Sequence, residues 1–279
     1  MEIMILAVNH GTFAYQKEKE ILRDICFSAG PGDLIAVLGP NGSGKTTLLR
    51  CIMGFLKWNS GGSFLDGKNI RDISNRNLWQ SIAYVPQGKG TGISYTVREM
   101  ILLGCASRHG FFEKPDKEDE EQVGRIMQKM GLSEIEKQKC TELSGGQIQM
   151  VLIARAMAAE PDILILDEPE SNLDFKNQLL VLSTLKKLSE SGTACIFNTH
   201  FPAHAARHAN KSLLLMNDGE HLFGKTEEVI TEENISKAFG VRVSIGNVNA
   251  GEQQIPYVMP VEVIHTEENG SGEEKDFKK

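Results

Sequence analysis

Residues 39–46 read GPNGSGKT, and this stretch decides the fold class. It has the spacing GxxxxGK(S/T), follows an apolar run at 34–38 and precedes a segment at 46–55 whose apolar residues have helical spacing. Glycines let backbone N–H groups converge on an anion, and the start of a helix adds a favourable dipole. A plain glycine-rich turn is the alternative, but the complete motif between a strand and a helix favours a phosphate site.

The positions of this loop have separate predicted tasks. Lys45 is predicted to reach the β- and γ-phosphates, and Thr46 to place its hydroxyl on Mg²⁺. The glycines allow the backbone to approach the phosphates closely. The set predicted to bind the nucleotide here is Gly39, Pro40, Asn41, Gly42, Ser43, Gly44, Lys45, Thr46 and Thr47.

A second segment, ILILDE at 163–168, is an apolar run that ends in two carboxylates. A buried strand delivers such acids at the carboxyl edge of an open α/β sheet, where ligands bind. Asp167 suits a metal ion, directly or through water. Glu168 suits the attacking water as general base, a role that contributes about 10²–10⁴-fold. Two acids at a strand end can also cap the next helix, but the phosphate loop in the same chain favours the catalytic interpretation.

A third segment, LSGGQ at 143–147, opens a helix-like stretch that Pro161 stops. Ser144 suits the N-cap of that helix, and the two glycines let another group approach the backbone closely. By itself SGG is a simple helix start. In a chain that already contains one anion-binding helix start, it indicates a second.

The rest of the chain arranges these motifs in an α/β frame. Strands are predicted at Met4–Val8 and Ile21–Phe27, and Asp66-Gly67 predicts a hairpin turn. Short apolar strands at 163–166 and 195–198, separated by a helix, are typical of a parallel sheet. A helical insert is expected at about 95–158, a small C-terminal appendage at 241–266 and a disordered tail at 267–279.

Composition excludes several classes of protein. Hydrophobic residues make up 41% of the 279 residues, enough for a core, and the net charge of −7 argues against a nucleic-acid partner bound through a basic surface. Apolar runs such as 213–216 are far shorter than the roughly 20 residues of a spanning helix. The 5 cysteines are scattered without a CxxC, which is typical of reduced thiols that fill a core.

LSGGQ, shortly before the strand that ends in Asp167 and Glu168, resembles the signature of ABC-type ATPases. Further marks of that family follow in order. They are Tyr15 where the family places its adenine-stacking aromatic, Gln87 in the Q-loop, Ser171-Asn172-Leu173-Asp174 in the D-loop and His200 as the switch histidine. The resemblance covers roughly residues 1–240. It implies an α/β fold, namely a P-loop NTPase core with an antiparallel β subdomain and a helical insert.

The same resemblance implies ATP hydrolysis by a pair of chains. Two copies would bind head to tail, with ATP and Mg²⁺ between the phosphate loop of one copy and the signature of the other. The residues implied on the signature side are Ser144, Gly145, Gly146 and Gln147.

Four further residues receive implied roles. Gln87 would contact Mg²⁺ or water, His200 would hold the γ-phosphate, and Asp174 would cross the dimer seam. Tyr15 would stack on adenine, worth about 1–3 kcal/mol by analogy with base–aromatic stacking, and Phe13 is a neighbouring candidate.

Two stretches resemble a narrower group of importer ATPases, those for iron chelates, haem, cobalamin and related metal compounds. They are YTVREMILLG at 95–104 and LDFKNQ at 173–178. This implies separate integral membrane permease subunits as partners, a substrate-binding protein as an indirect partner, and a peripheral position on the cytoplasmic face of the cell membrane. The alternative is a soluble ABC ATPase in cofactor assembly, which a co-purifying membrane protein would exclude.

Two other patterns are given simpler interpretations. His200, His204 and His208 are spaced by four residues, but Pro202 interrupts the segment and argues against a shared helical metal face. The acidic run at 117–121 is interpreted as a solvated helix face.

Overall fold

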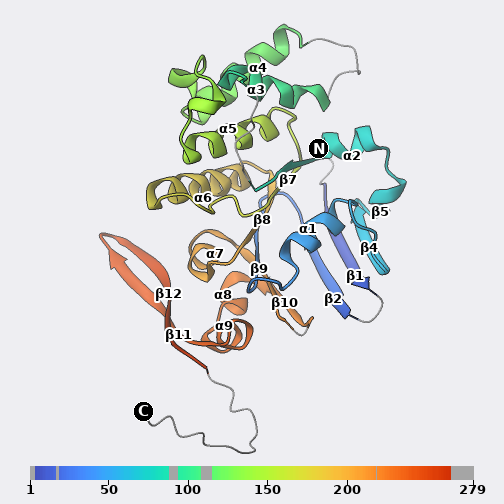
Figure 1. Cartoon of the computed structure of the whole chain (residues 1–279), viewed down its shortest axis with the longest axis vertical. Coiled ribbons are helices and arrows are strands. Elements are labelled where there is room, and N and C mark those ends of the chain that lie inside the picture. Colours follow the sequence, from blue (N-terminus) through green and yellow to red (C-terminus); the bar gives the residue numbers. More distant parts are fainter. Residues whose placement is uncertain (1–3, 17–18, 88–93, 108–114, 218, 265–279) are drawn as a thin grey trace, which may run out of the picture.

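A twisted central sheet holds the molecule together in the computed structural model, which describes residues 4–16, 19–87, 94–107, 115–217 and 219–264 (Figure 1). In sheet order its strands are β10 (His221–Lys225), β9 (Lys211–Leu215), β3 (Leu34–Leu38), β8 (Ala194–Thr199), β7 (Ile163–Leu166) and β6 (Ile82–Val85). All but β10 run parallel to their neighbours. The predicted parallel sheet is therefore confirmed.

Strand β3 shows why this sheet is buried on both faces. Each of its residues is at most 1% exposed. Ile35 and Val37 face one apolar cluster, while Leu34, Ala36 and Leu38 face a second on the opposite side. A central parallel strand covered on both faces reads as a continuous apolar run, which is the pattern at 34–38.

The first cluster lies between the central sheet and a second, antiparallel sheet. In order, its strands are β2 (Lys19–Ala29), β1 (Leu6–Gln16), β4 (Ser60–Leu65) and β5 (Lys68–Asn69). The predicted hairpin turn is present, with Asp66 and Gly67 at φ 49° and 76°. Strands β1 and β2 are longer than predicted because bulges interrupt their pairing, and the apolar alternation is lost where the chain bulges.

The second cluster is covered by the helical insert, drawn in green in Figure 1. Its helices are α3 (Val97–Leu102), α4 (Lys117–Lys129) and α5 (Gly145–Met157). The solvated face predicted at 117–121 is wrong at one position. Asp119 is fully buried, because its carboxylate accepts from the backbone N–H of Asp116 in a capping box at the start of α4.

The other helices complete the frame. They are α1 (Lys45–Ile52), α2 (Asn75–Ser81), α6 (Phe175–Glu190), α7 (Pro202–His208), α8 (Thr226–Val229) and α9 (Glu232–Phe239). After Gly240, which ends α9 at a φ of 67°, a hairpin of β11 (Val241–Ala250) and β12 (Gln253–Val263) extends from the body (Figure 1). The tail predicted at 267–279 lies outside the described residues.

All 5 cysteines are free thiols, and four are buried. Across the described ranges, no helix combines the length and hydropathy needed to cross a membrane.

Candidate nucleotide-binding and catalytic site

The phosphate loop lies between β3 and α1, at the carboxyl end of the central sheet. Gly44 is the N-cap of α1 in a left-handed conformation with φ 95°, and no side chain caps the helix. A Cβ at this position would lie 2.7 Å from Ile21 Cγ2, so only glycine fits. The first N–H groups of α1 are therefore left for a ligand, and the helix dipole favours an anion there.

Lys45 and Ser43 line this loop and are both nearly buried, at 6% and 3% exposure. Lys45 Nζ donates to the carbonyls of Gly39 and Pro40 at 2.8 and 2.9 Å, which holds the ammonium over the loop. Burial lowers the pKa of Lys45, although the carboxylates of Glu168 and Asp167 act in the opposite direction. Ser43 Oγ is buried without a hydrogen-bond partner in the described part of the chain, which suits a phosphate oxygen as its partner.

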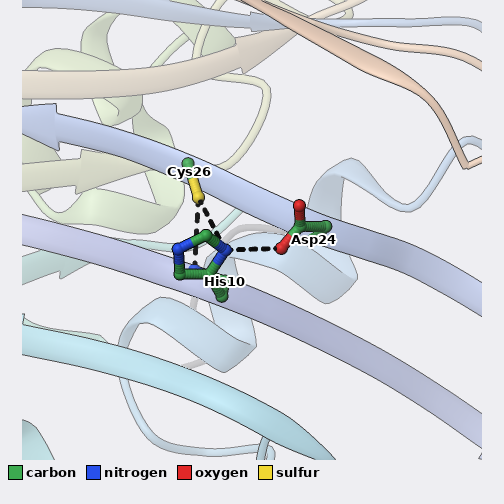
Figure 2. A group of neighbouring side chains, drawn as sticks. All are labelled: His10, Asp24 and Cys26. Carbon is green, nitrogen blue, oxygen red and sulfur yellow. Dashed lines mark hydrogen bonds and ion pairs between the residues drawn. The ribbon is translucent and has the colours of Figure 1, made fainter.

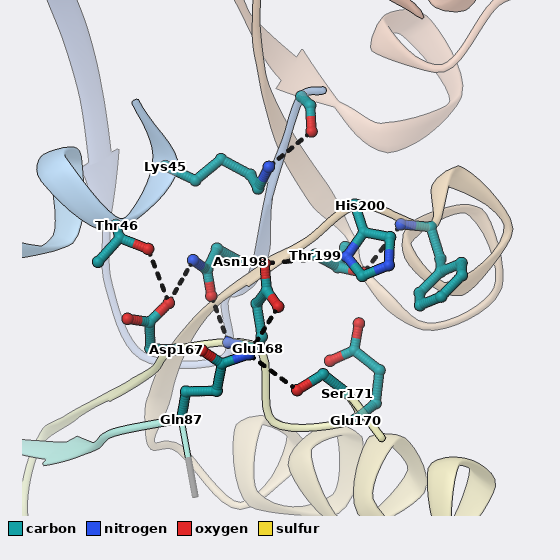
Figure 3. Close-up of polar contacts among 12 residues, drawn as sticks. Lys45, Thr46, Gln87, Asp167, Glu168, Glu170, Ser171, Asn198, Thr199 and His200 are labelled. Carbon is teal, nitrogen blue, oxygen red and sulfur yellow. Dashed lines mark hydrogen bonds and ion pairs between the residues drawn. The ribbon is translucent and has the colours of Figure 1, made fainter. Parts of the chain in front are cut away.

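Asp167 follows β7 and accepts hydrogen bonds from three side chains, of which Figure 3 shows Thr46 and Asn198. Its Oδ1 accepts from Thr46 Oγ1 at 3.1 Å and from Asn198 Nδ2 at 2.6 Å. Its Oδ2 accepts from the hydroxyl of Tyr84 at 3.4 Å. Burial, followed by the charge of Asp167 and this hydrogen bond, raises the pKa of Tyr84 to about 12, so the phenol remains a donor. The structure thus brings the predicted metal residues Thr46 and Asp167 together.

Glu168 stands at the centre of a second set of contacts. Its Oε2 accepts from Gln87 Nε2 at 3.0 Å, and its Oε1 lies 3.8 Å from His200 Nδ1. The backbone of Glu168 has φ 45°, and its N–H donates to Asn198 Oδ1. A non-glycine residue in the left-handed region is strained, and such strain is typical of functional positions held by their surroundings. Gln87, Glu168 and His200 come from three different segments and meet here (Figure 3).

Tyr15 lies where an adenine ring could stack beside the loop. Its side chain is 57% exposed, and its hydroxyl lies 3.4 Å from Thr47 Oγ1. The neighbouring candidate Phe13 is only 6% exposed and packs edge-to-face against Tyr15 with ring centroids 4.9 Å apart. Tyr15 is therefore the aromatic side chain of the two that is free to stack.

Comparisons with known proteins agree with this geometry. A family model described as "ABC transporter" matches residues 22–171. The chain is 38% identical to an uncharacterized ABC transporter ATP-binding protein of Methanocaldococcus jannaschii, over 94% of this chain and 100% of that protein.

The chain belongs to the ATP-binding subunits of ABC transporters. It is 36% identical to the molybdate import ATP-binding protein MolC of Haemophilus influenzae, over 84% of this chain and 87% of that one. A solved metal-chelate type ABC transporter in an inward-facing conformation superposes with a TM-score of 0.81 at 33% identity, over 92% of this chain and 98% of that one. The predicted fold, ATP binding and ATPase activity are confirmed at the level of the family.

The signature of this ABC subunit lies on the helical insert. Ser144 is the N-cap of α5, and its hydroxyl accepts from Gln147 N–H at 3.3 Å. The side chain of Gln147 accepts from Ser144 N–H at 2.9 Å, which completes a capping box. Figure 1 places α5 among the insert helices and α1 beside the antiparallel sheet, so the two helix starts belong to different parts of the subunit.

The signature segment at 143–147 contacts α6, the next helix along the chain. Gly146 lies directly against Asn177 of α6, where a Cβ would overlap the Asn177 side chain. Asp174 is the N-cap of α6, and its Oδ1 accepts from Asn177 N–H at 2.8 Å. The predicted interface residues Gly146 and Asp174 therefore both contact Asn177.

Several residues of the site were not singled out by sequence reasoning. Asn198 binds both Asp167 and the backbone of Glu168, and Ser171 Oγ accepts from Gln87 Nε2 at 3.3 Å. A polar residue at the end of an otherwise apolar strand, two positions before His200, is the pattern that could have identified Asn198. Ser171 belongs to the predicted D-loop, but its contact with the Q-loop follows only from the fold.

Glu170 and the histidines of α7 form a separate group beside His200. Glu170 is 1% exposed, and its Oε1 lies 3.6 Å from His204 Nδ1. The Phe201 ring contacts the rings of both His200 and His204 in tilted arrangements, with centroid distances of 4.0 and 4.9 Å. His200 precedes α7, while His204 and His208 are on it. The shared helical face that sequence reasoning rejected for His200 is therefore absent from this described segment.

Proposed function

We propose that this ABC subunit hydrolyses ATP with Glu168 as general base, in a head-to-tail dimer that powers a separate membrane permease. The observation that carries the chemistry is the position of Glu168, next to the phosphate loop and within reach of both Gln87 and His200. Water attacks the γ-phosphorus while its proton passes to the Glu168 carboxylate, and the bond from the γ-phosphorus to the ADP oxygen breaks.

The other residues hold the substrate in place for this step. Lys45 and the backbone donors of residues 39–47 bind the phosphates, and Tyr15 stacks on the adenine. His200 holds the γ-phosphate and orients the water. Gln87 connects this site to the helical insert, because it follows β6 and leads toward α3.

The donors around Asp167 fit Mg²⁺. Hydroxyl, carboxylate and amide oxygens are ligands that this hard cation prefers. Thr46 and Asp167 are in contact, and Gln87 binds the neighbouring Glu168. These residues would hold the ion directly or through water, and it would neutralise charge on the β- and γ-phosphates.

The dimer is supported by two separate glycine-rich helix starts, an uncapped one at α1 and one at α5 that presents the Ser144 hydroxyl and two glycines. Ser144, Gly145, Gly146 and Gln147 of one copy would face ATP on the phosphate loop of the other. Asp174, at the start of α6, would lie at the seam. Each copy carries the phosphate loop and the signature on different parts of its fold. A second copy would therefore be needed to bring a phosphate loop and a signature together around one ATP.

The transport role follows from the relatives. One is named for molybdate import, and a solved neighbour is a metal-chelate type transporter. We therefore extend the proposal to import of a metal compound such as an iron chelate, haem or cobalamin. Permease subunits and a substrate-binding protein would be the partners, and the ATPase would lie on the cytoplasmic face of the membrane.

The proposal also divides the chain. Residues 1–240 form the ATPase domain, with the helical subdomain at about 95–158, and residues 241–266 form a C-terminal appendage. Support comes from the hairpin β11–β12, which pairs with itself and packs on α7 and α9.

The first test replaces the general base. Glu168→Gln removes the proton acceptor but keeps the side-chain size, so hydrolysis should fall about 10²–10⁴-fold while ATP–Mg²⁺ binding persists. Binding is measured by equilibrium dialysis, hydrolysis by single-turnover phosphate release, and dimer formation with ATP by light scattering.

Glu160→Gln is the matched control, because Glu160 precedes the opposite end of β7. It should hydrolyse ATP at the normal rate. If Glu168→Gln also turned over normally, Glu168 would not be the base.

A second test addresses coupling to a membrane. The chain is expressed with permease genes of the relatives' type, reconstituted in vesicles, and assayed for ATPase activity with and without a binding protein loaded with molybdate or an iron chelate. A rise in activity supports import. Co-purification with soluble proteins alone supports the cofactor-assembly alternative.

A further inference from the structure

Three side chains with metal-binding donors meet on the antiparallel sheet, outside the nucleotide site (Figure 2). His10 of β1 and Asp24 of β2 approach to 2.7 Å between Nδ1 and Oδ1. Cys26 Sγ lies 3.7 Å from the same Nδ1. The ligand atoms of all three residues lie within 4.8 Å of one another.

Irregular strand pairing creates this group. The pairs Val8↔Phe27 and Gly11↔Ile25 leave two residues of β1 opposite Cys26, which is a bulge. Regular alternation along β2 turns Asp24 and Cys26 away from the buried Ile25 and Phe27, and the second irregularity, around Asp24, shifts the alternation so that Leu22 is buried as well. His10 and Asp24 have φ of 50° and 53°.

Both residues adopt the left-handed backbone conformation, which is unfavourable for a non-glycine residue. As a result, His10 on β1 presents a nitrogen and Asp24 on β2 presents an oxygen to the sulfur of Cys26. Strain of this kind clusters at ligand sites, where the surroundings hold it in place.

The donor set selects a class of ion. Imidazole nitrogen, thiolate sulfur and carboxylate oxygen together are the ligands of Zn²⁺ and similar divalent transition metals, whereas Mg²⁺ and Ca²⁺ take oxygen. Around a tetrahedral ion with bonds of about 2.0–2.3 Å, neighbouring donors lie roughly 3.3–3.8 Å apart. The distance between His10 Nδ1 and Cys26 Sγ, 3.7 Å, already has this value.

We propose that His10, Asp24 and Cys26 form a binding site for a divalent transition metal of the zinc type. The three residues supply three ligands, and water completes the coordination. Small adjustments suffice, because the side chains of His10 and Asp24 are 76% and 68% exposed and can separate freely from their present 2.7 Å contact. The Cys26 thiol gives up its proton to the solvent when the metal–sulfur bond forms.

The surroundings of Cys26 favour this role. Its sulfur accepts a hydrogen bond from the backbone N–H of His10 at 3.3 Å, which holds the sulfur beside the His10 ring. The backbone N–H of Cys26 donates in turn to His221 Nε2 at 3.4 Å, which anchors β2 to β10. Cys26 is half-buried, whereas Cys51, Cys105, Cys140 and Cys195 are buried in the core. The thiol at this site is therefore accessible in a way that the other four are not.

Cobalt(II) is the probe for the test, because it takes zinc sites and reports a bound thiolate by a charge-transfer absorption band. The full chain is reduced, freed of metal and nucleotide, and titrated with Co²⁺ and then with competing Zn²⁺. We expect one Co²⁺ per chain with a thiolate band that Zn²⁺ removes.

Variants identify the ligands. Cys26→Ser should abolish the band, and His10→Asn and Asp24→Asn should each weaken Zn²⁺ binding at least about tenfold. Ser28→Ala, two residues from Cys26 on the same exposed face of β2, should bind as the parent does. ATP binding should be unchanged in every variant, which separates this site from the proposed catalytic one.

Three results would overturn the proposal. They are a parent chain without a thiolate band, a band that survives Cys26→Ser, and ordinary Zn²⁺ affinity in both His10→Asn and Asp24→Asn. In any of these cases the group is a surface ion pair beside a free thiol, and such a pair contributes little to stability.

Discussion

The starts of α1 and α5 are built differently, although both are glycine-rich helix N-termini. At α1 the N-cap is Gly44, no side chain caps the helix, and the N–H groups stay open to a ligand. At α5 the N-cap is Ser144, whose hydroxyl is already bonded to Gln147 N–H. The first end is shaped to surround an anion with backbone donors. The second is already capped by Ser144. It presents a hydroxyl and two glycines to another molecule, which suits one side of an interface.

The largest expected effect comes from a substitution at the uncapped N-terminus of α1. Gly44→Ala forces alanine into the left-handed region and drives its Cβ against Ile21, so the loop must change shape. ATP affinity should fall at least about a hundredfold, which corresponds to the loss of about 3 kcal/mol of phosphate binding. The measurement is ATP binding to the monomeric chain.

Gly32→Ala is the control for the strain alone. Gly32 also has a left-handed φ, 85°, and nothing lies within 4 Å of its Cβ position. It should lose about 1–2 kcal/mol of stability but bind ATP normally. Equal losses of ATP affinity in both variants would contradict the role of Gly44.

The second prediction concerns the capped N-terminus of α5. Gly146→Ala pushes a methyl group into Asn177 and separates α5 from α6 at the predicted seam. ATP should still bind to the phosphate loop, whereas ATP-dependent dimer formation and hydrolysis should fall about tenfold, a loss of about 1.4 kcal/mol.

Mixing this variant with Gly44→Ala sharpens the comparison. A mixed dimer pairs the intact phosphate loop of one copy with the intact signature of the other, so part of the hydrolysis should return. No recovery on mixing, with both variants folded, would argue against shared sites.

The third prediction separates capping from ligand contact. Ser144→Ala removes the cap of α5 and should cost about 1 kcal/mol of stability, with a further loss in ATP-dependent dimer formation. Thr96→Ala removes the matching capping box of α3, formed with Glu99. It should cost the same stability by thermal unfolding and leave dimer formation intact. If both variants dimerise equally well, Ser144 serves only its helix.

The smallest expected effect is a pH dependence of ATP affinity at the N-terminus of α1, where Lys45 lies. Burial lowers the pKa of Lys45, so this lysine loses its charge at a pH below the usual 10.5. ATP affinity should therefore decline as pH rises from neutral toward 10.5. In the same window the unfolded chain holds the extra proton, so the contribution of Lys45 to folding stability increases with pH.

Glu168→Gln should move the decline of ATP affinity to lower pH, because the Glu168 carboxylate raises the pKa of Lys45. Competition binding of ATP across this pH range measures the effect. Glu160→Gln should follow the parent curve. A flat curve for the parent chain would contradict the predicted titration.

Sequence patterns predicted the N-termini of α1 and α5 and most of the strands and helices around them. The strand at 34–38, the glycine loop and the helix after it are specified by neighbours in the chain, so local rules suffice. The same holds for the hairpin turn at Asp66-Gly67 and for the capping role of Ser144. Bounds were less accurate for β1 and β2, because bulges depend on pairing with a partner strand.

The amino-acid sequence by itself determined which residues are proposed to carry the chemistry, since Lys45, Asp167, Glu168 and His200 stand at recognisable positions of local motifs. Only the tertiary structure decided how they meet. Residues 46, 87, 167, 168 and 198 are joined by contacts across long stretches of chain, and the sheet order that brings them to one edge is a property of packing. The same is true of His10, Asp24 and Cys26, whose meeting depends on two bulges that no spacing of residues announces.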